Sequence, residues 1–243
     1  MKAKFYQVGG CVRDRRLGVK SNDIDFSVEA DSYLAMREAV ILRCGGDPAN
    51  PEHAAEKGPF IKVDKPEFVT IRAVDPVEGG VDFVLCRKDG TYNTDGRRPD
   101  FVEIGTLYDD LARRDFTVNA MAEDESGNLI DPFNGEADLK NGLLRCVGDT
   151  EKRLTEDSLR MLRAIRFAIM KGFTLDADLY AFLRNPASAR LLGHISVERI
   201  NLEMRKCFNF DTLKSLDMLQ NFPTIMEAVF SRMKLKPTLE KTF

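Results

Sequence analysis

The sequence predicts an α+β protein, in which an α/β head with a mixed sheet and flanking helices precedes a small all-helical part. In roughly the first 135 residues, short apolar runs of strand period alternate with helix-like runs. From Leu139 onward, apolar residues recur at helical spacing. The chain has 243 residues, enough for a compact domain and a helical companion. We therefore expect three segments, over 1–138, 139–208 and 209–243.

The head is expected to contain several strands and short helices. The predicted strands are runs of β-branched and aromatic residues at 4–8, 24–28, 66–74, 80–87 and 116–122. The predicted helical elements are 12–17, a helix capped by Asp31 or Ser32 that runs to about Arg43, and a turn at 108–113. Stretches rich in Gly, Pro, Asn and Asp predict loops at 44–58 and 88–100.

The helical part is expected to hold two longer and two shorter helices. The run EDSLRMLRAIRFAIMKGF predicts one helix over 156–173. A second is predicted at 196–208, with Ser196 as its N-cap. Shorter helices are expected at 212–220 and 224–233.

Composition is that of an ordinary globular protein, with 43% hydrophobic and 31% charged residues. No apolar run approaches the ~20 residues of a membrane span, and the N-terminus does not have the pattern of a signal peptide. The five cysteines are far apart and odd in number, which favours reduced thiols in a cytoplasm. The net charge of −3 is unusual for a nucleic-acid binder, so any such binding requires locally concentrated positive charge.

The triplet DID at 23–25 places two carboxylates close together in a strand-like setting. If it is a strand, Asp23 and Asp25 project from the same face. A bound Mg²⁺ would relieve their repulsion, whereas D-x-D taken alone fits a polar edge strand better. Glycines at 9 and 10 lie between a strand and a helix, a place where backbone N–H groups can approach a phosphate, and Arg13 follows on the first helical turn. The alternative is a tight strand–helix turn, and the glycine pair alone is a weak signal.

Five blocks of sequence together resemble one enzyme family. In order, they are GGCVRDRRLG…DIDF, RRDFTVNAMA, DPFNGEADL, EDSLRMLRAIRFA and SVERINLEMRK, which lie within residues 6–206. Their order resembles class II tRNA nucleotidyltransferases (CCA-adding enzymes) and the bacterial poly(A) polymerases, in the DNA polymerase β-like superfamily. The resemblance implies a polymerase β-like head followed by a helical neck and a short remnant of the body. It also implies a short member, because the family usually continues through further helical body and tail segments.

The resemblance implies a two-metal site with two Mg²⁺ ions. In the family, the residues that match Asp23 and Asp25 hold the catalytic metals. A third carboxylate lies on a neighbouring strand, and Asp82 is the best match here, although family members more often carry Glu at that position.

The resemblance also implies a triphosphate site. Gly10, Arg13 and Arg114 match positions that bind the incoming nucleotide. Asp115 and Asn119 match residues that organise the sugar and the backbone of the site, and a buried structural ion pair is an equal alternative for Asp115.

A third implied site reads the base. Asp157 and Arg160 match the family's base-reading pair, and on one helix they would share a face. A carboxylate accepts and a guanidinium donates, so the pair could satisfy cytosine and adenine but not uracil or guanine. Arg163 and Arg166 match further nucleotide contacts. Without the resemblance, these charges would be interpreted as a solvated face or as helix pairs such as Glu156 with Arg160.

The implied function is template-independent addition of C and A from CTP and ATP to the 3′ end of tRNA or a tRNA-like RNA. Residues 145–171 hold seven Arg or Lys against four Asp or Glu, a locally basic segment, and Lys88, Arg97 and Arg98 add to it. A poly(A) polymerase is the nearest alternative. A non-catalytic nucleotide- or RNA-binding module and a toxin-like nucleotidyltransferase are others. We expect no membrane partner, and a homodimer could supply additional surface.

Overall fold

The computed structural model describes residues 3–21, 23–49, 61–90 and 101–232. Within these ranges the chain forms two compact units, which divide between Asn141 and Gly142. The first unit carries the sheet and the second is largely helical, so the predicted mixed α/β class is confirmed. None of the described helices is long and apolar enough to cross a membrane.

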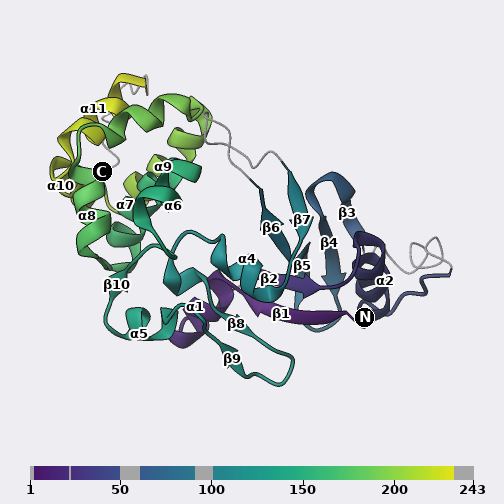
Figure 1. Ribbon diagram of the computed structural model, residues 1–243. Coiled ribbons are helices and arrows are strands. Elements are labelled where there is room, and N and C mark those ends of the chain that lie inside the picture. The colour runs from purple at the N-terminus through teal and green to yellow at the C-terminus, as the bar shows by residue number, and fades with distance from the viewer. Residues whose placement is uncertain (1–2, 22, 50–60, 91–100, 233–243) are drawn as a thin grey trace, which may run out of the picture. The chain divides into compact units, whose positions relative to one another are not determined.

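A mixed seven-stranded sheet forms the first unit, in the order β3-β4-β5-β2-β1-β8-β9 (Figure 1). Its strands are β1 (Lys4–Val8), β2 (Ile24–Glu29), β3 (Ile61–Lys65), β4 (Thr70–Asp75), β5 (Gly79–Leu85), β8 (Ala122–Glu123) and β9 (Leu129–Ile130). The central pair β2 and β5 is parallel, and the other neighbouring pairs are antiparallel. A separate hairpin pairs β6 (Arg87–Asp89) with β7 (Val102–Ile104).

Short helices flank this sheet. They are α1 (Gly10–Arg16), α2 (Tyr33–Arg43), α4 (Leu107–Ala112) and α5 (Gly135–Lys140), with 3₁₀ turns η1 (Pro66–Phe68) and η2 (Thr117–Asn119). The Ser32 hydroxyl caps α2 by accepting a hydrogen bond from Ala35 N at 3.0 Å, which selects one of the two predicted caps.

One face of the sheet is apolar and carries α2. Phe26 and Phe83 stack at 5.3 Å between ring centroids, and Met36 and Val40 of α2 belong to the same buried cluster. Because side chains alternate along a strand, Asp25 projects from the opposite face. The polar residues discussed below therefore lie away from the main core.

The second unit is a helical bundle. Its elements are α6 (Thr150–Glu156), α7 (Leu159–Lys171), α8 (Ala177–Arg184), η3 (Ser188–His194), α9 (Val197–Phe210), α10 (Thr212–Gln220) and α11 (Pro223–Arg232), with a small parallel pair β10 (Leu143–Leu144) and β11 (Thr174–Leu175). The amphipathic helices α7 and α9 pack against each other. Ser196 caps α9 as predicted, through a hydrogen bond from Arg199 N to its Oγ at 3.4 Å.

Three predicted elements are wrong in part. The strand predicted at 66–74 begins only at Thr70, because Pro66 opens a 3₁₀ turn. The strand predicted at 116–122 is mostly the 3₁₀ turn η2, with only its last residue in β8. The single helix predicted over 156–173 is two helices separated at Asp157.

Several short elements fall outside the predicted pattern, among them the strands β3, β6, β7, β9, β10 and β11 and the helices α5, α6, α8 and η3. Of the loop expected at 88–100, the described residues Lys88 and Asp89 lie in β6. The remainder from 91 to 100, with Arg97 and Arg98, lies outside the described residues.

Candidate active site

Two carboxylates lie side by side on the central strands, and a third precedes one of these strands. Asp25 of β2 and Asp82 of β5 face each other in parallel register. Asp23 directly precedes β2, which begins at Ile24, the residue at which the sequence predicted this strand to begin. Asp23 and Asp82 both act electrostatically on Asp25, because the charge of each raises its pKa.

The pKa of Asp25 is raised to about 6. Burial is the largest cause, followed by the negative charges of Asp23 and Asp82, while the charges of Arg114 and Arg72 act in the opposite direction. Arg72 lies opposite Asp82 on β4, with its Nε 3.6 Å from Asp82 Oδ1. Asp25 therefore occupies a place where a cation would be favoured.

These oxygens are the ligand type that Mg²⁺ prefers. The carboxylate crowding around Asp25 fits a divalent cation in that respect. Among the described residues, however, no group of three His, Cys, Asp or Glu side chains is arranged closely enough to hold a metal ion. The carboxylate oxygens are suitable ligands for Mg²⁺, but the described side chains do not by themselves surround a metal position.

The turn between β1 and α1 requires glycine at position 9. Gly9 has a φ of 75°, in the left-handed region, and a Cβ there would lie 2.7 Å from Arg114 Nη1. A Cβ on Gly10 would meet Arg13 Nη2 at 3.6 Å, an ordinary contact. The sequence singled out Gly10, whereas the close approach of Arg114 falls on its neighbour.

A buried polar chain runs from α1 to η2. Arg13 is almost fully buried, and its Nη1 donates to Asn119 Oδ1 at 2.5 Å. Asn119 Nδ2 donates to Asp115 Oδ1 at 3.0 Å, and the Phe116 N–H donates to the same oxygen at 2.8 Å. The structure thus brings together three of the predicted site residues, and Asp115 orients Asn119.

Arg114 is held from several directions. It donates to Asp110 Oδ2 at 3.1 Å, to the Asn119 carbonyl oxygen at 3.3 Å and to Ser27 Oγ at 3.3 Å. Its Nε is buried without a hydrogen-bond partner among the described residues. A buried donor without a partner is uncommon in folded proteins, which singles out this side chain.

Asp110 is a site residue that the sequence reasoning missed. Burial alone would raise its pKa, but the charges of Arg113 and Arg114 and a hydrogen bond from Ser27 hold the pKa below its ordinary value. Its Oδ1 receives Arg113 Nη2 at 2.6 Å. The available signal was an acidic residue three and four positions before an arginine pair.

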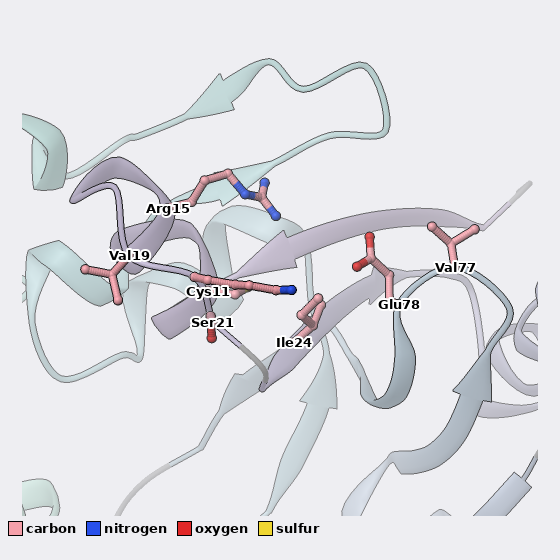
Figure 2. A pocket seen from close by; sticks show the side chains of 8 residues that line it. Cys11, Arg15, Val19, Ser21, Ile24, Val77 and Glu78 are labelled. Carbon is pink, nitrogen blue, oxygen red and sulfur yellow. The ribbon is translucent and has the colours of Figure 1, made fainter.

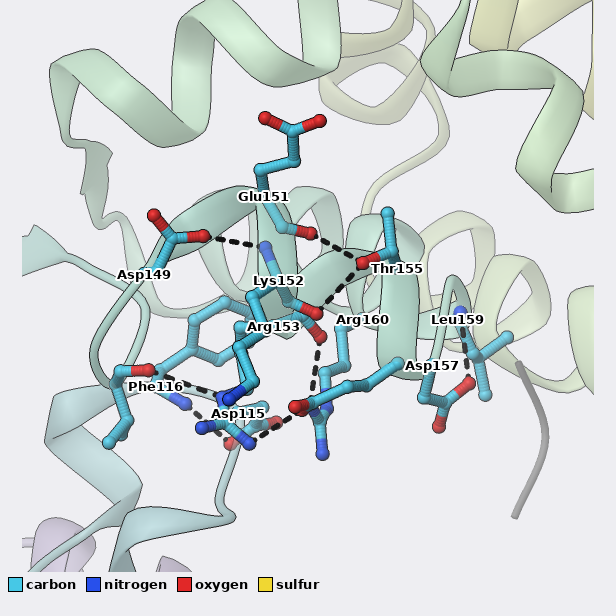
Figure 3. A network of polar contacts seen from close by, with 12 residues as sticks. Asp115, Phe116, Asp149, Glu151, Lys152, Arg153, Thr155, Asp157, Leu159 and Arg160 are labelled. Atoms are coloured by element: carbon cyan, nitrogen blue, oxygen red, sulfur yellow. Dashed lines mark hydrogen bonds and ion pairs between the residues drawn. The ribbon is translucent and has the colours of Figure 1, made fainter. Parts of the chain in front are cut away.

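The second unit holds the predicted base-reading residues around the break between α6 and α7 (Figure 3). Asp157 is extended, with φ −144° and ψ 100°, and Arg160 lies in the first turn of α7. The prediction that the two share one helix face is therefore wrong. Arg160 donates to the Arg153 carbonyl oxygen at 2.8 Å and to Glu156 Oε2 at 3.1 Å, the pair expected from spacing alone.

The other two arginines of α7 differ in their surroundings. Arg166 donates to Glu203 Oε2 of α9 at 2.5 Å, and its guanidinium lies 4.6 Å from the centroid of the Phe167 ring. Arg163 lies 5.8 Å from the same ring. The structure thus places Arg166 in a contact between helices, while its predicted nucleotide contact remains a prediction.

A separate cavity of about 610 Å³ lies between α1, the segment that follows it and the β4–β5 turn (Figure 2). Its lining includes Cys11, Ser21 and Ile24, and none of the three candidate aspartates. Ile24 projects from the opposite face of β2 to Asp25. The carboxylate cluster is thus distinct from this cavity.

Comparisons with known proteins agree on one group. Residues 5–145 match the family model described as the poly A polymerase head domain. The CCA-adding enzyme of Oceanobacillus iheyensis is 38% identical over 208 residues, which cover 84% of this chain and 45% of that enzyme. The chain therefore spans less than half the length of this relative.

Two solved structures have a similar fold. The Bacillus stearothermophilus CCA-adding enzyme in complex with CTP is 34% identical, with a TM-score of 0.68 over 89% of this chain and 47% of that one. The Thermotoga maritima CCA-adding enzyme complexed with tRNA_CCA is 27% identical, with a TM-score of 0.72 over 97% of this chain and 50% of that one.

Proposed function

Because the chain belongs to the poly A polymerase head-domain family, we propose that it is a template-independent RNA nucleotidyltransferase that adds C and A to the 3′ end of tRNA. Its substrates are CTP, ATP and a tRNA or tRNA-like 3′ end, as suggested by the similar enzymes solved with CTP and with tRNA_CCA. The observation that carries the proposal is the carboxylate cluster of Asp23, Asp25 and Asp82 on the polar face of the sheet.

In this reaction the 3′-oxygen of the RNA bonds to the α-phosphorus of the nucleotide, and the bond to pyrophosphate breaks. Asp23 and Asp25, with Asp82 beside them, would hold two Mg²⁺ ions. When bound, these ions supply activation of the 3′-hydroxyl and neutralisation of the leaving pyrophosphate. The carboxylate pair in parallel register supports this assignment.

The arginines would bind the triphosphate. Arg114 keeps one buried donor without a partner in the described structure, next to the glycine turn. Arg13 is fixed by Asn119, and Asp115 in turn fixes Asn119. Preorganised donors of this kind stabilise charge that develops at phosphorus without reorganising during the reaction.

Base choice is assigned to Asp157 and Arg160. The carboxylate accepts from the exocyclic amine of cytosine or adenine, and the guanidinium donates to the adjacent ring nitrogen. Uracil and guanine invert that pattern, which leaves polar groups unpaired and lowers their use. Arg163 and Arg166 are proposed to support the same nucleotide.

The test is an incorporation assay on tRNA transcripts that lack the terminal CCA. The protein is incubated with each labelled nucleotide singly and in pairs, with and without Mg²⁺, and the 3′ ends are sequenced. We expect Mg²⁺-dependent addition of C, C and A. Asp25→Asn should abolish addition, whereas Asp31→Asn, at an exposed aspartate six residues later in the sequence, should retain it.

A second candidate is a poly(A) polymerase, which the family model's description favours. Long tracts of A with no C would establish it. Nucleotide binding without any incorporation would instead support a non-catalytic binding module. We also propose a cytoplasmic location, since all five cysteines are free thiols and buried.

A further inference from the structure

The carboxylate of Asp157, which lies between α6 and α7, is bound by a residue of a third helix, α9. Arg199, in the first turn of α9, places its Nη2 3.1 Å from Asp157 Oδ2 and 3.4 Å from Oδ1. The Leu159 N–H also donates to Oδ1, at 3.1 Å. The Asp157 carbonyl oxygen accepts from Arg160 N at 3.0 Å, which fixes the backbone at the break.

These contacts engage the two carboxylate oxygens unequally. Oδ1 accepts from Leu159 and lies near Arg199, whereas the contact described for Oδ2 comes from Arg199 alone. An ionised carboxylate has about four acceptor positions. Oδ2 therefore retains acceptor capacity for one more donor, in an orientation that the guanidinium of Arg199 sets.

The partner residue Arg160 is fixed independently. It is held by the Arg153 carbonyl oxygen and by Glu156, both of α6. Thus α6 orients the donor of the proposed base-reading pair, while α9 orients its acceptor. A substitution of Arg199 should therefore change the orientation of Asp157 and leave Arg160 in place.

We propose that Arg199 is a positioning residue that sets nucleotide choice by fixing the orientation of the Asp157 carboxylate. This inference rests on the proposed function, in which Asp157 accepts a hydrogen bond from the amine of cytosine or adenine. Arg199 acts through Asp157 and does not itself read the base.

The consequence for selectivity follows from the geometry. A carboxylate that can rotate no longer holds an acceptor at the place where the amine must lie, so the preferred base loses affinity. The repulsion between the carboxylate and the carbonyl oxygen that uracil carries in place of the amine also falls, because the carboxylate can turn away. Small misplacements of such groups change rates by up to about 100-fold, so we expect CTP-over-UTP preference to fall roughly 10- to 100-fold.

Arg199 is suited to this test because its loss should leave the fold intact. Its side chain is 38% exposed and that of Asp157 is 23% exposed, and ion pairs this open contribute little stability. The hydrogen bond from its backbone N–H to Ser196 does not depend on the side chain. Arg205, an exposed arginine on the same helix, provides a matched control.

The experiment measures kcat/KM for CTP and for UTP on a tRNA transcript that lacks CCA, with the wild type, Arg199→Ala, Arg199→Lys and Arg205→Ala. We expect Arg199→Ala to lower the CTP/UTP ratio, Arg199→Lys to restore part of it, and Arg205→Ala to match the wild type. An unchanged ratio in Arg199→Ala would overturn the inference. Equal losses for both nucleotides would do so too, because they indicate a general structural role.

A double-mutant cycle on the same ratio separates a direct effect from one through Asp157. In an Asp157→Ala background, Arg199→Ala should cause no further loss of selectivity, and an additive loss would contradict the proposal. Dissociation constants for CTP and UTP measured by calorimetry extend the test to binding. Wild-type protein that neither binds nor incorporates CTP would refute the proposed function itself, a result distinguishable from any outcome with Arg199. If Arg199→Ala fails to fold, Arg199→Gln replaces it under the same criteria.

Discussion

At Asp25, the charged carboxylate that the proposed chemistry needs lowers the stability of the fold. Its pKa in the folded protein is about 6, whereas an unfolded aspartate titrates near 3.8. Between about pH 4 and 6, the folded state therefore holds a proton that the unfolded state has released. Stability falls as pH rises through this window, because the charge must be formed among other carboxylates.

We predict that Asp25→Asn is more stable than the wild type at pH 7.5 in the absence of divalent cations. The gain should be on the order of 1–2 kcal/mol, after discounting the shift for solvent screening. The free energy of unfolding of this variant should also not fall between pH 4 and 6, as that of the wild type does. Thermal unfolding from pH 3.5 to 8 measures both, and Asp31→Asn serves as the control. An Asp25→Asn variant less stable than the wild type at pH 7.5 would contradict the assigned repulsion.

We further predict that Mg²⁺ raises the melting temperature of the wild type and leaves that of Asp25→Asn nearly unchanged. A cation bound by the native carboxylates stabilises the fold by mass action. The measurement is thermal unfolding over a Mg²⁺ titration at constant ionic strength. Equal shifts in both proteins would place the cation elsewhere.

Some residues could be predicted from sequence because their motif is local. Asp23 and Asp25 are recognisable in the triplet DID, whereas Asp82 was identified only through the family resemblance. Asp110 was missed although its spacing before Arg113 and Arg114 was a local signal. The requirement for glycine at position 9 could not be predicted, because Arg114 lies far from Gly9 in sequence and approaches it only in the folded chain.

At the scale of elements, the β1–α1 turn sets where Arg114 lies. We predict that Gly9→Ala loses about 1–3 kcal/mol of unfolding free energy, because the left-handed φ and the contact with Arg114 both oppose a methyl group. Gly10→Ala is the matched control and should be nearly neutral. Urea unfolding compares them, and similar losses in both would show that the approach of Arg114 is not the cause.

The pairing of α7 with α9 depends on a buried ion pair. Burial alone would raise the pKa of Glu203, but Arg166 and Lys206 hold it below its ordinary value. We predict that Arg166→Met lowers the free energy of unfolding by about 3–5 kcal/mol, because it leaves the buried Glu203 carboxylate without its arginine partner. Adding Glu203→Gln should recover much of that loss. Lys206→Ala, at the exposed side of the pair, should cost far less. Urea unfolding of the three variants measures these differences, and a double mutant no more stable than Arg166→Met would refute the interpretation.

Elements with strong periodicity and clear caps were predictable. The helix at 212–220 matches α10, and Ser32 and Ser196 cap helices as expected. The stretch 116–122 is rich in strand-forming residues, yet tertiary contacts override that preference and fold it as η2. Strands of two or three residues, such as β8 and β10, are too short to show any period.

At the scale of the whole molecule, charge is distributed more evenly than the sequence implies. The segment 145–171 is rich in arginine and lysine. In the structure, Arg153 and Arg160 both pair with Glu156, and Arg166 pairs with Glu203. At least three of the seven Arg and Lys side chains in this segment are therefore paired, with two carboxylates between them. The predicted division into segments ending at 138 and 208 remains a prediction.

We accordingly predict that binding of tRNA depends only modestly on salt. The slope of log K against log salt should be about −2 to −3, as for roughly three neutralised phosphates. Fluorescence anisotropy from 50 to 300 mM KCl measures it, with Arg145→Ala expected to reduce the slope, since that side chain is 51% exposed. A slope steeper than about −5 would show a larger basic surface.

The break between α6 and α7 has a consequence for redesign. The two residues proposed to read the base are held by different helices, Arg160 by α6 and Asp157 by α9. Reversing the nucleotide preference therefore requires changes at the partners Arg199 and Glu156 as well as at Asp157 and Arg160. Exchanging the two readers alone would place a guanidinium opposite Arg199 and a carboxylate opposite Glu156, both with like charge, so a working variant requires compensating substitutions on both helices.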